Sequence, residues 1–294
     1  MLRITRVRQA LVMTGITSLV LASSLVAGAS STAGAYNAAD AKMVPSSYKG
    51  TTLQVATDAT YAPDEMMSGT TMVGFDVDLM KAIGTTLGLT INEVNVTFDD
   101  IIPGVKSGKF EVGNSSSTDK KSREKLVNFV DYFQAGEGVY TKASSKVKFS
   151  GLSSLCGLKV AVETGTTEQS DAQKTAKTCA ASKKLTVLSY PTQTDANLAV
   201  SSGQASVGFL DSQVAGYVVS QSKGKFKLVG RAIEVAPYGL ATAKTPTGKA
   251  LSKAFQMAIK TLIANGTYAA ILSKWGVSAG ALSASKIVLN GAIS

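Results

Sequence analysis

Most of the chain alternates between two patterns of apolar and polar residues. Short apolar runs, typical of buried strands, are separated by longer segments in which apolar residues recur at helical spacing. The segment 74–89 shows the second pattern, with an apolar residue at every fourth position: Phe75, Leu79, Ile83 and Leu87. Strands that alternate with helices predict an α/β protein with mostly parallel sheets.

The predicted elements fall into two series along the chain. The first comprises strands at 53–56, 91–96 and 110–113, helices at 74–89, 99–107 and 119–126, and an extended segment at 127–130. The second starts after about residue 150 and comprises strands at 158–162, 185–189, 205–210 and 226–229, a polar helix ending near 179, helices at 193–202, 212–220, 247–264 and 268–275, and an extended segment at 239–242. Two such series indicate two lobes.

Residues 1–35 break this alternation and have the layout of a secretory signal peptide. Three Arg and no acid stand in the first nine residues, an apolar run covers about 10–27, and small residues follow. Two A-x-A sequences predict cleavage after Ala29 or after Ala35. The alternative is an uncleaved membrane anchor, since the apolar run is long for a signal peptide.

The expected location of the mature protein follows from this segment. No Cys stands after the apolar run, so the sequence does not predict a lipid-anchored lipoprotein. We expect an exported protein, periplasmic or extracellular, in which residues 36–46 form a flexible lead-in. Export would place Cys156 and Cys179 in an oxidising compartment, so one disulfide between them is expected, and two free buried thiols are the alternative.

Composition and charge exclude several functions. The 294 residues include 30 Lys and Arg, 20 Asp and Glu and no His. The absence of His excludes a His general base, a Ser–His–Asp or Cys–His pair and a His metal ligand, and two Cys cannot form a Cys₄ zinc site. Without residues 1–35, 27 basic and 20 acidic residues remain, a net charge of +7. The Lys residues are scattered, so we expect no nucleic-acid partner. We also expect no metal, because His is absent and Cys occurs only twice, and no cofactor, because the glycines are too few for a P-loop or dinucleotide-binding motif.

Ligands of parallel α/β sheets bind beyond the carboxyl ends of the strands, near helix N-termini. This rule selects four loops, at 58–65, 114–118, 163–167 and 211–213. A free amino acid carries a carboxylate, an ammonium and a side chain, so its site needs an Arg, a carboxylate and oriented N–H groups. These loops and the helices that follow them contain all three.

Segments from Leu53 to Trp275 carry a resemblance to a known family. They are 55–63 (VATDATYAP), 74–79 (GFDVDL), 98–99 (FD), 102–104 (IPG), 106–108 (KSG), 121–124 (KSRE), 131–133 (DYF), 160–162 (VAV), 165–167 (GTT), Asp211, 237–239 (PYG) and 266–268 (GTY). In this order the chain resembles the family 3 extracellular solute-binding proteins, the amino-acid-binding components of ABC importers.

The resemblance assigns roles to two charged residues. Arg123 would hold the ligand's α-carboxylate, for which a guanidinium offers two parallel hydrogen bonds that Lys cannot copy. Asp211, at the carboxyl end of an apolar strand, would hold the α-ammonium. Without the resemblance, Arg123 could be a solvated helix charge, and Asp211 could be a helix N-cap.

Two pairs of small polar residues are expected to complete the binding of the ligand's α-carboxylate and α-ammonium. Ser116 and Thr118 could offer a carbonyl, a hydroxyl and N–H groups, with turn formation as the alternative. Thr166 and Thr167 follow Gly165 at a predicted helix N-terminus, which favours an anion, with a plain N-cap turn as the alternative.

Four residues could surround the ligand's side chain. Tyr61 is expected to form an apolar wall, or else to be a core aromatic, and Asp58 lies near it in the sequence. Asp64 stands where the family usually has an aromatic residue, and Glu163 precedes the Gly-Thr-Thr segment. If Asp58, Asp64 and Glu163 all faced the cavity, they would favour a cationic side chain such as that of Arg or Lys.

The resemblance implies a two-lobed type II periplasmic-binding-protein fold with two hinge crossings. One lobe is expected at 47–136 plus 238–294 and the other at 137–237. The protein would capture a free amino acid as a monomer and deliver it to an ABC permease without covalent chemistry. The rivals are an enzyme on the same fold, such as a cyclohexadienyl-type dehydratase, and a sensor module.

Overall fold

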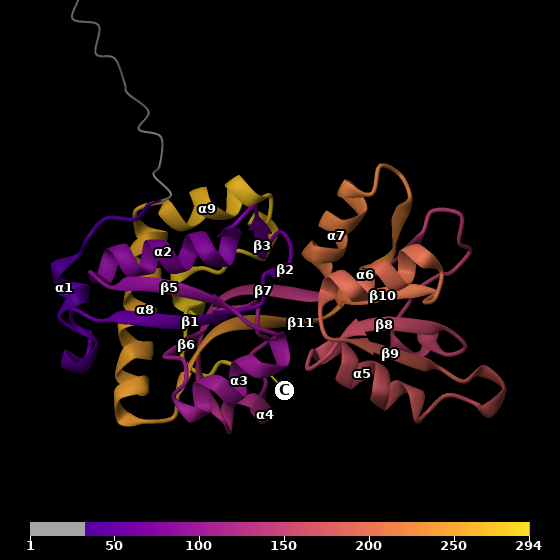
Figure 1. Cartoon of the computed structure of the whole chain (residues 1–294), viewed down its shortest axis with the longest axis horizontal. Helices are drawn as coiled ribbons and strands as arrows, with labels where there is room; N and C mark the ends of the chain where they lie inside the picture. The colour runs from indigo at the N-terminus through magenta and orange to yellow at the C-terminus, as the bar shows by residue number, and fades with distance from the viewer. Residues whose placement is uncertain (1–32, 294) are drawn as a thin grey trace, which may run out of the picture.

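The computed structural model describes residues 33–293. Almost all of the predicted signal peptide, residues 1–35, lies outside this range. The described chain forms two α/β halves side by side, joined by two long strands (Figure 1). No helix among residues 33–293 combines the length and the apolar composition that spanning a membrane requires.

Within the described residues, an eight-stranded mixed sheet has the order β5-β1-β6-β11-β7-β10-β8-β9. Its outer strands are β1 (Thr52–Thr57), β5 (Thr90–Asn95) and β6 (Val112–Gly113) in the first half, and β8 (Lys159–Glu163), β9 (Thr186–Tyr190) and β10 (Val207–Asp211) in the second. Each set is parallel, as the sequence predicted.

The two central strands, β7 (Val127–Lys142) and β11 (Phe226–Ala243), pair antiparallel over most of their length and carry the chain between the halves. The sequence predicted only their ends, as extended segments at 127–130, 226–229 and 239–242. Gly136 and Gly138 interrupt the apolar run of β7, yet both are buried at close contacts. A Cβ on Gly136 would lie 2.7 Å from the Ile233 carbonyl oxygen, and one on Gly138 would lie 2.9 Å from Ser212 Cα.

Helices cover both faces of this sheet. The first half contains α2 (Phe75–Leu87), α3 (Phe98–Ser107), α4 (Lys121–Glu124), α8 (Pro246–Ala264) and α9 (Thr267–Trp275), and the second contains α5 (Thr167–Ala176), α6 (Gln193–Ser202) and α7 (Ser212–Gln221). Short 3₁₀ turns lie at Ser46–Tyr48, Leu152–Leu155, Ala181–Lys183, Ser278–Gly280 and Ala284–Lys286. The predicted apolar stripe of α2 is fully buried, and its helix ends at Gly88 with φ of 68°.

Each half has its own apolar core. The larger core of the first half includes Leu53, Phe75 and Phe255, and a core of the second half includes Val160 and Phe209. Because β7 and β11 are the two segments that pass between these cores, the fold is the predicted two-lobed one with two crossings.

The structure differs from the sequence prediction in two places near the start of the described chain. A small antiparallel sheet of β2 (Thr60–Tyr61), β3 (Glu65–Ser68) and β4 (Thr71–Val73) was not predicted. The expected flexible lead-in, 36–46, instead contains α1 (Ala38–Ala41), which packs on the first half. Thr261 Oγ1 donates to Asp40 Oδ2 at 2.7 Å, and Val44 is buried in the core.

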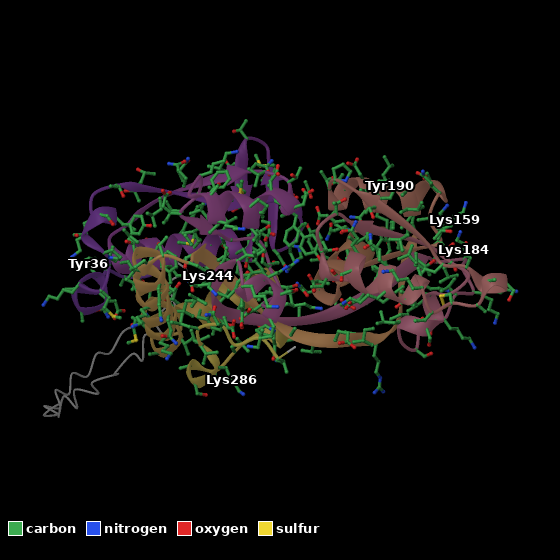
Figure 2. The ribbon with its side chains drawn as sticks, turned by 90° about the horizontal axis from the view of Figure 1, so that it is seen from below. Tyr36, Lys159, Lys184, Tyr190, Lys244 and Lys286 are labelled. Atoms are coloured by element: carbon green, nitrogen blue, oxygen red, sulfur yellow. A yellow bond between two sulfur atoms is a disulfide. The ribbon has the colours of Figure 1, made fainter. Side chains whose placement is uncertain are left out.

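The disulfide prediction is confirmed, because Cys156 and Cys179 are bonded and join the turn before β8 to the end of α5. The scattering of the basic residues is also visible in the folded chain. Figure 2 shows Lys159 and Lys184 on the second half and Lys244 and Lys286 on the first.

Candidate ligand-binding site

A cavity between the two halves brings together the loops that the sequence selected. Its lining consists of Asp58, Tyr61, Phe98, Ser116, Thr118, Arg123, Glu163, Thr166, Thr167, Glu168 and Asp211. All eight residues predicted to bind the ligand are in this set, together with Glu163. The cavity contains about 280 Å³ of space between atoms, most of it too narrow for a water molecule. A bound amino acid would therefore require its walls to move apart.

Arg123 lies on the short helix α4 with its guanidinium between the halves. Its Nη1 donates to the carbonyl oxygen of Thr118 at 2.9 Å, and its Nη2 donates across the cavity to that of Gly165 at 2.8 Å. The guanidinium carbon also lies 5.5 Å from the centre of the Phe98 ring, within cation–π range. A guanidinium has five N–H donors, so three remain for a ligand.

Asp211 ends β10 directly before α7, and its carboxyl group is buried. Its Oδ2 accepts a hydrogen bond from the Tyr61 hydroxyl at 2.9 Å, and its own N–H donates to the same hydroxyl at 3.0 Å. The side chain makes no capping hydrogen bond to α7. Burial raises the pKa of Asp211 to about 7, although hydrogen bonds from Tyr238 and Tyr61 favour its ionised form.

Asp58 and Glu163 approach each other from opposite halves and share a side-chain hydrogen bond. Asp58 also accepts from the N–H groups of Thr60 at 2.9 Å and Phe98 at 3.0 Å. Burial raises the pKa of Asp58, and burial together with the Asp58 charge raises the pKa of Glu163 well above its ordinary value. One carboxyl oxygen of Glu163 is buried and has no hydrogen-bond partner among the described residues.

Glu168 is a lining residue that the sequence analysis missed. It stands in the first turn of α5, where an acid is usually exposed to solvent and interacts favourably with the helix dipole. Here it is 1% exposed and accepts from the Thr167 hydroxyl at 3.1 Å. Burial and the Asp211 charge raise the pKa of Glu168 to about 8. Its position directly after Thr167 was the signal that could have identified it.

Asp64 differs from the expectation, because it is buried but does not line the cavity. The β2–β3 turn directs it away from the cavity, and its Oδ2 accepts from Ser116 Oγ of the first half at 2.9 Å and from Gln213 Nε2 of the second half at 2.7 Å. Asp64 thus holds the hydroxyl of Ser116, a lining residue, without reaching the cavity itself. Of the three acids predicted to face a cationic side chain, Asp58 and Glu163 reach the cavity.

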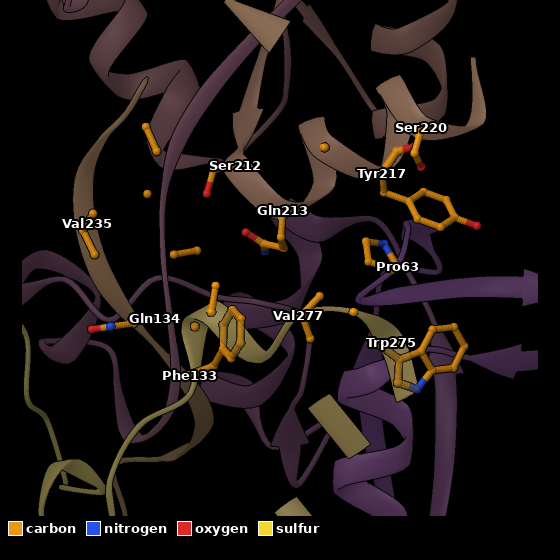
Figure 3. A pocket seen from close by; sticks show the side chains of 17 residues that line it. Pro63, Phe133, Gln134, Ser212, Gln213, Tyr217, Ser220, Val235, Trp275 and Val277 are labelled. Carbon is orange, nitrogen blue, oxygen red and sulfur yellow. The ribbon is translucent and has the colours of Figure 1, made fainter. Parts of the chain in front are cut away.

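A second hollow, with about 1270 Å³ of space between atoms including open solvent, also lies between the halves (Figure 3). Pro63, Phe133 and Trp275 border it from the first half, and Ser212 and Tyr217 border it from the second. None of the described residues that line it is charged, so it offers no ion-pair partner for the carboxylate and the ammonium of a zwitterion. Among residues 33–293 no group of His, Cys, Asp and Glu side chains could hold a metal ion.

Comparisons with known proteins point to one family of binding proteins. The family model for bacterial extracellular solute-binding proteins, family 3, matches residues 53–278. The arginine-binding protein ArgT of Corynebacterium glutamicum is 31% identical over 214 residues, which cover 72% of this chain and 69% of that protein.

Two solved structures are similar over most of their length. An ancestral arginine-binding protein bound to arginine has a TM-score of 0.71 and 32% identity, and the match covers 76% of this chain and 97% of that one. An ancestral amino-acid-binding protein described as a precursor of cyclohexadienyl dehydratase has a TM-score of 0.68 and 30% identity, and the match covers 76% and 95%.

Proposed function

This chain belongs to family 3 of the bacterial extracellular solute-binding proteins, and we propose that it captures a free amino acid with a cationic side chain, arginine above all, for an ABC permease. The observation that carries the proposal is the charge of the cavity. One Arg faces four carboxyl groups, those of Asp58, Glu163, Glu168 and Asp211. An arginine-binding relative and an arginine-bound structure support the same class of ligand.

The four carboxyl groups and Arg123 suggest two ends for the ligand. At one end, Arg123 would hold the α-carboxylate and Asp211 the α-ammonium, with Thr118 and Thr167 beside them. At the other end, the Asp58–Glu163 pair would receive the cationic side chain. A guanidinium there would supply positive charge to two carboxyl groups that now share a hydrogen bond.

The proposal includes closure of the lobes on the ligand. The lobe boundaries we propose are 47–136 plus 238–294 and 137–237, because β7 and β11 cross at these places. Arg123 and Tyr61 come from one lobe and Thr167 and Asp211 from the other, so a bound amino acid would bridge both. The closed shape is what a permease would recognise, and the protein would act as an exported monomer after removal of residues 1–35.

A screen of amino acids tests the proposal. We expect arginine, lysine and ornithine to raise the thermal transition and to bind in titration calorimetry. Citrulline provides the matched control, because it has nearly the shape of arginine without the charge, and it should bind at least about tenfold more weakly. Preference for glutamate or for a neutral amino acid would contradict the assignment.

An enzyme remains the second candidate, because one structural neighbour is a precursor of a dehydratase. The raised pKa of Glu168 supplies a carboxylic acid of the kind that general acid catalysis uses. Against this, Arg123 and Asp211 together suit a zwitterion better than a dicarboxylate. Incubation with prephenate or arogenate decides between them, since turnover would favour the enzyme and ligand recovered unchanged would favour the binder.

A further inference from the structure

The end of the described chain lies outside the segment that the family model matches, 53–278, and it packs along β7. Ile287 is buried in the core of the first half, and its carbonyl oxygen accepts from Gln256 Nε2 at 2.8 Å. The Asp131 N–H donates to the Val288 carbonyl oxygen at 3.0 Å. In Figure 1 the C-terminus is drawn beside α4.

Residues 290–292, which we call the strap, connect this end of the chain to β7 and α4. Asn290 has a φ of 52° and bonds Phe129 twice, donating its N–H to the carbonyl oxygen at 3.0 Å and accepting the Phe129 N–H on Oδ1 at 2.8 Å. The Ala292 N–H then donates to Glu124 Oε1 at 3.1 Å. Between them, Gly291 lies beside Asp119, and its backbone favours the ionised form of that carboxyl group.

Glycine at the centre of the strap allows a close approach to Asp131. A Cβ at position 291 would lie 2.1 Å from Asp131 Oδ2, so any side chain there would push this carboxyl group away. The strap therefore packs closely at the place where Asp119, Glu124 and Asp131 meet.

Two acids that lie beside the strap, Asp119 and Glu124, stand on either side of Arg123 in the sequence. Asp119 directly follows Thr118, whose carbonyl oxygen accepts from the Arg123 guanidinium, and Glu124 directly follows Arg123. Helix α4 has only four residues, and so short a helix has little stability of its own. Its orientation depends on external partners such as the strap.

We propose that the strap positions Arg123, so that its guanidinium meets the carboxylate of the amino acid. Through its hydrogen bond to Glu124, the residue that directly follows Arg123, the strap holds one end of the segment that directs Arg123 into the cavity. This inference rests on the proposed function, because it assigns the strap an effect on ligand binding as well as on stability.

The test compares deletion of residues 290–294 with a matched deletion of residues 293–294, which leaves the three strap residues in place. Both keep the buried Ile287, so the core of the first half is retained. The ligands are L-arginine and L-argininamide, which differ at the carboxylate. We expect the longer deletion to weaken arginine binding about tenfold and argininamide binding much less, so that the ratio of the two affinities falls toward that of Arg123→Lys.

A second pair of variants separates positioning from general stability. Glu124→Gln retains an oxygen that can accept from Ala292, whereas Glu124→Ala does not. We expect Glu124→Gln to keep most of the wild-type affinity ratio and Glu124→Ala to lose it. A lower melting temperature with an unchanged ratio would show a structural role alone and would overturn the proposal.

Hydrogen exchange distinguishes failure of the strap from failure of the proposed function. In the longer deletion, amides of residues 119–126 should exchange faster than in the shorter one, whether or not an amino acid is present. If the wild-type protein bound no amino acid, the proposed function would fail, and faster exchange would still support the strap's hold on this segment. Equal amide exchange rates at residues 119–126 in the two deletions would overturn the proposal that the strap holds this segment.

Discussion

Binding of arginine should release protons, because the acids that would meet its positive charges are protonated more readily in the empty cavity. Burial raises the pKa of Asp211 to about 7 and that of Glu168 to about 8. A bound ammonium or guanidinium favours the ionised carboxylate and lowers both pKa values. The bound state therefore carries fewer protons, and the affinity should rise with pH until it passes the empty-state pKa values.

The size of the effect follows from those two pKa values. Between pH 8 and pH 6, the ionised fraction of a group with a pKa of about 7 falls roughly tenfold, and that of a group with a pKa of about 8 falls about fiftyfold. If both Asp211 and Glu168 must be ionised in the complex, arginine should bind roughly 500-fold more weakly at pH 6 than at pH 8. If only Asp211 must be, the loss is about tenfold.

Two other charged groups near Glu168, Glu137 and Arg123, should contribute little within this range. Burial raises the pKa of Glu137 to about 10, so it stays protonated in the empty protein at both pH values. Burial lowers the pKa of Arg123 below its ordinary value, but a guanidinium remains charged. Glu163 differs, because its pKa is raised well above its ordinary value and the guanidinium of arginine is proposed to reach it. Its ionisation in the complex would add to the proton release and make the pH dependence steeper.

Titration calorimetry from pH 6 to pH 8, in two buffers that differ in ionisation enthalpy, measures both the affinity and the number of protons released. The matched variant Glu168→Gln cannot ionise, so its affinity should change with pH by one proton less. An arginine affinity that varies less than about threefold over this range, or that falls as pH rises, would refute the reasoning.

Three further variants test separate parts of the structure. Arg123→Lys should weaken arginine binding about tenfold to a hundredfold in calorimetry, because one charge-assisted hydrogen bond contributes about 1.5–3 kcal/mol; wild-type affinity would contradict the role of Arg123. Replacing Cys156 and Cys179 by Ser should lower the free energy of unfolding in urea by about 3 kcal/mol, since the disulfide closes a loop with a sequence separation of 23; an unchanged midpoint would contradict this. Gly208→Ala should destabilise the second half by about 1–3 kcal/mol, because its Cβ would lie 2.1 Å from a buried tyrosine ring. The control Gly216→Ala, which has open space around the new methyl group, should not lower the stability. Equal urea midpoints for the two variants would count against the packing argument.

Local patterns predicted the elements whose stability is local. Helix α2 was predicted at 74–89 and spans Phe75–Leu87, because its apolar stripe and its final glycine are both visible in the sequence. The long strand β7 was predicted only at its start, because Gly136 and Gly138 weaken the strand pattern. Pairing with β11, which is distant in sequence, is what keeps this region extended.

The candidate site was also predicted in part, where the information is local in the sequence, and missed where it depends on distant segments. Loop positions and the family resemblance selected Arg123 and Asp211, which do line the cavity. The same reasoning could not show whether Glu168 and Asp64 line the cavity. The direction of each side chain depends on packing against segments that are distant in sequence. Glu168 faces the cavity from α5, whereas the small β2–β3 sheet turns Asp64 toward Ser116.

The contrast between the surface and the cavity explains how a basic protein could select a cationic ligand. The chain has a net charge of +10, which taken alone would disfavour arginine. At physiological salt, however, exposed charges are screened beyond about 8 Å, so scattered surface Lys residues act weakly inside the cavity. The carboxyl groups of Asp58, Glu163, Glu168 and Asp211 are buried and lie in the cavity wall itself, where screening is weak. The sign of charge that the ligand meets is therefore set by these four acids and Arg123, and the composition of the whole chain has little influence on it.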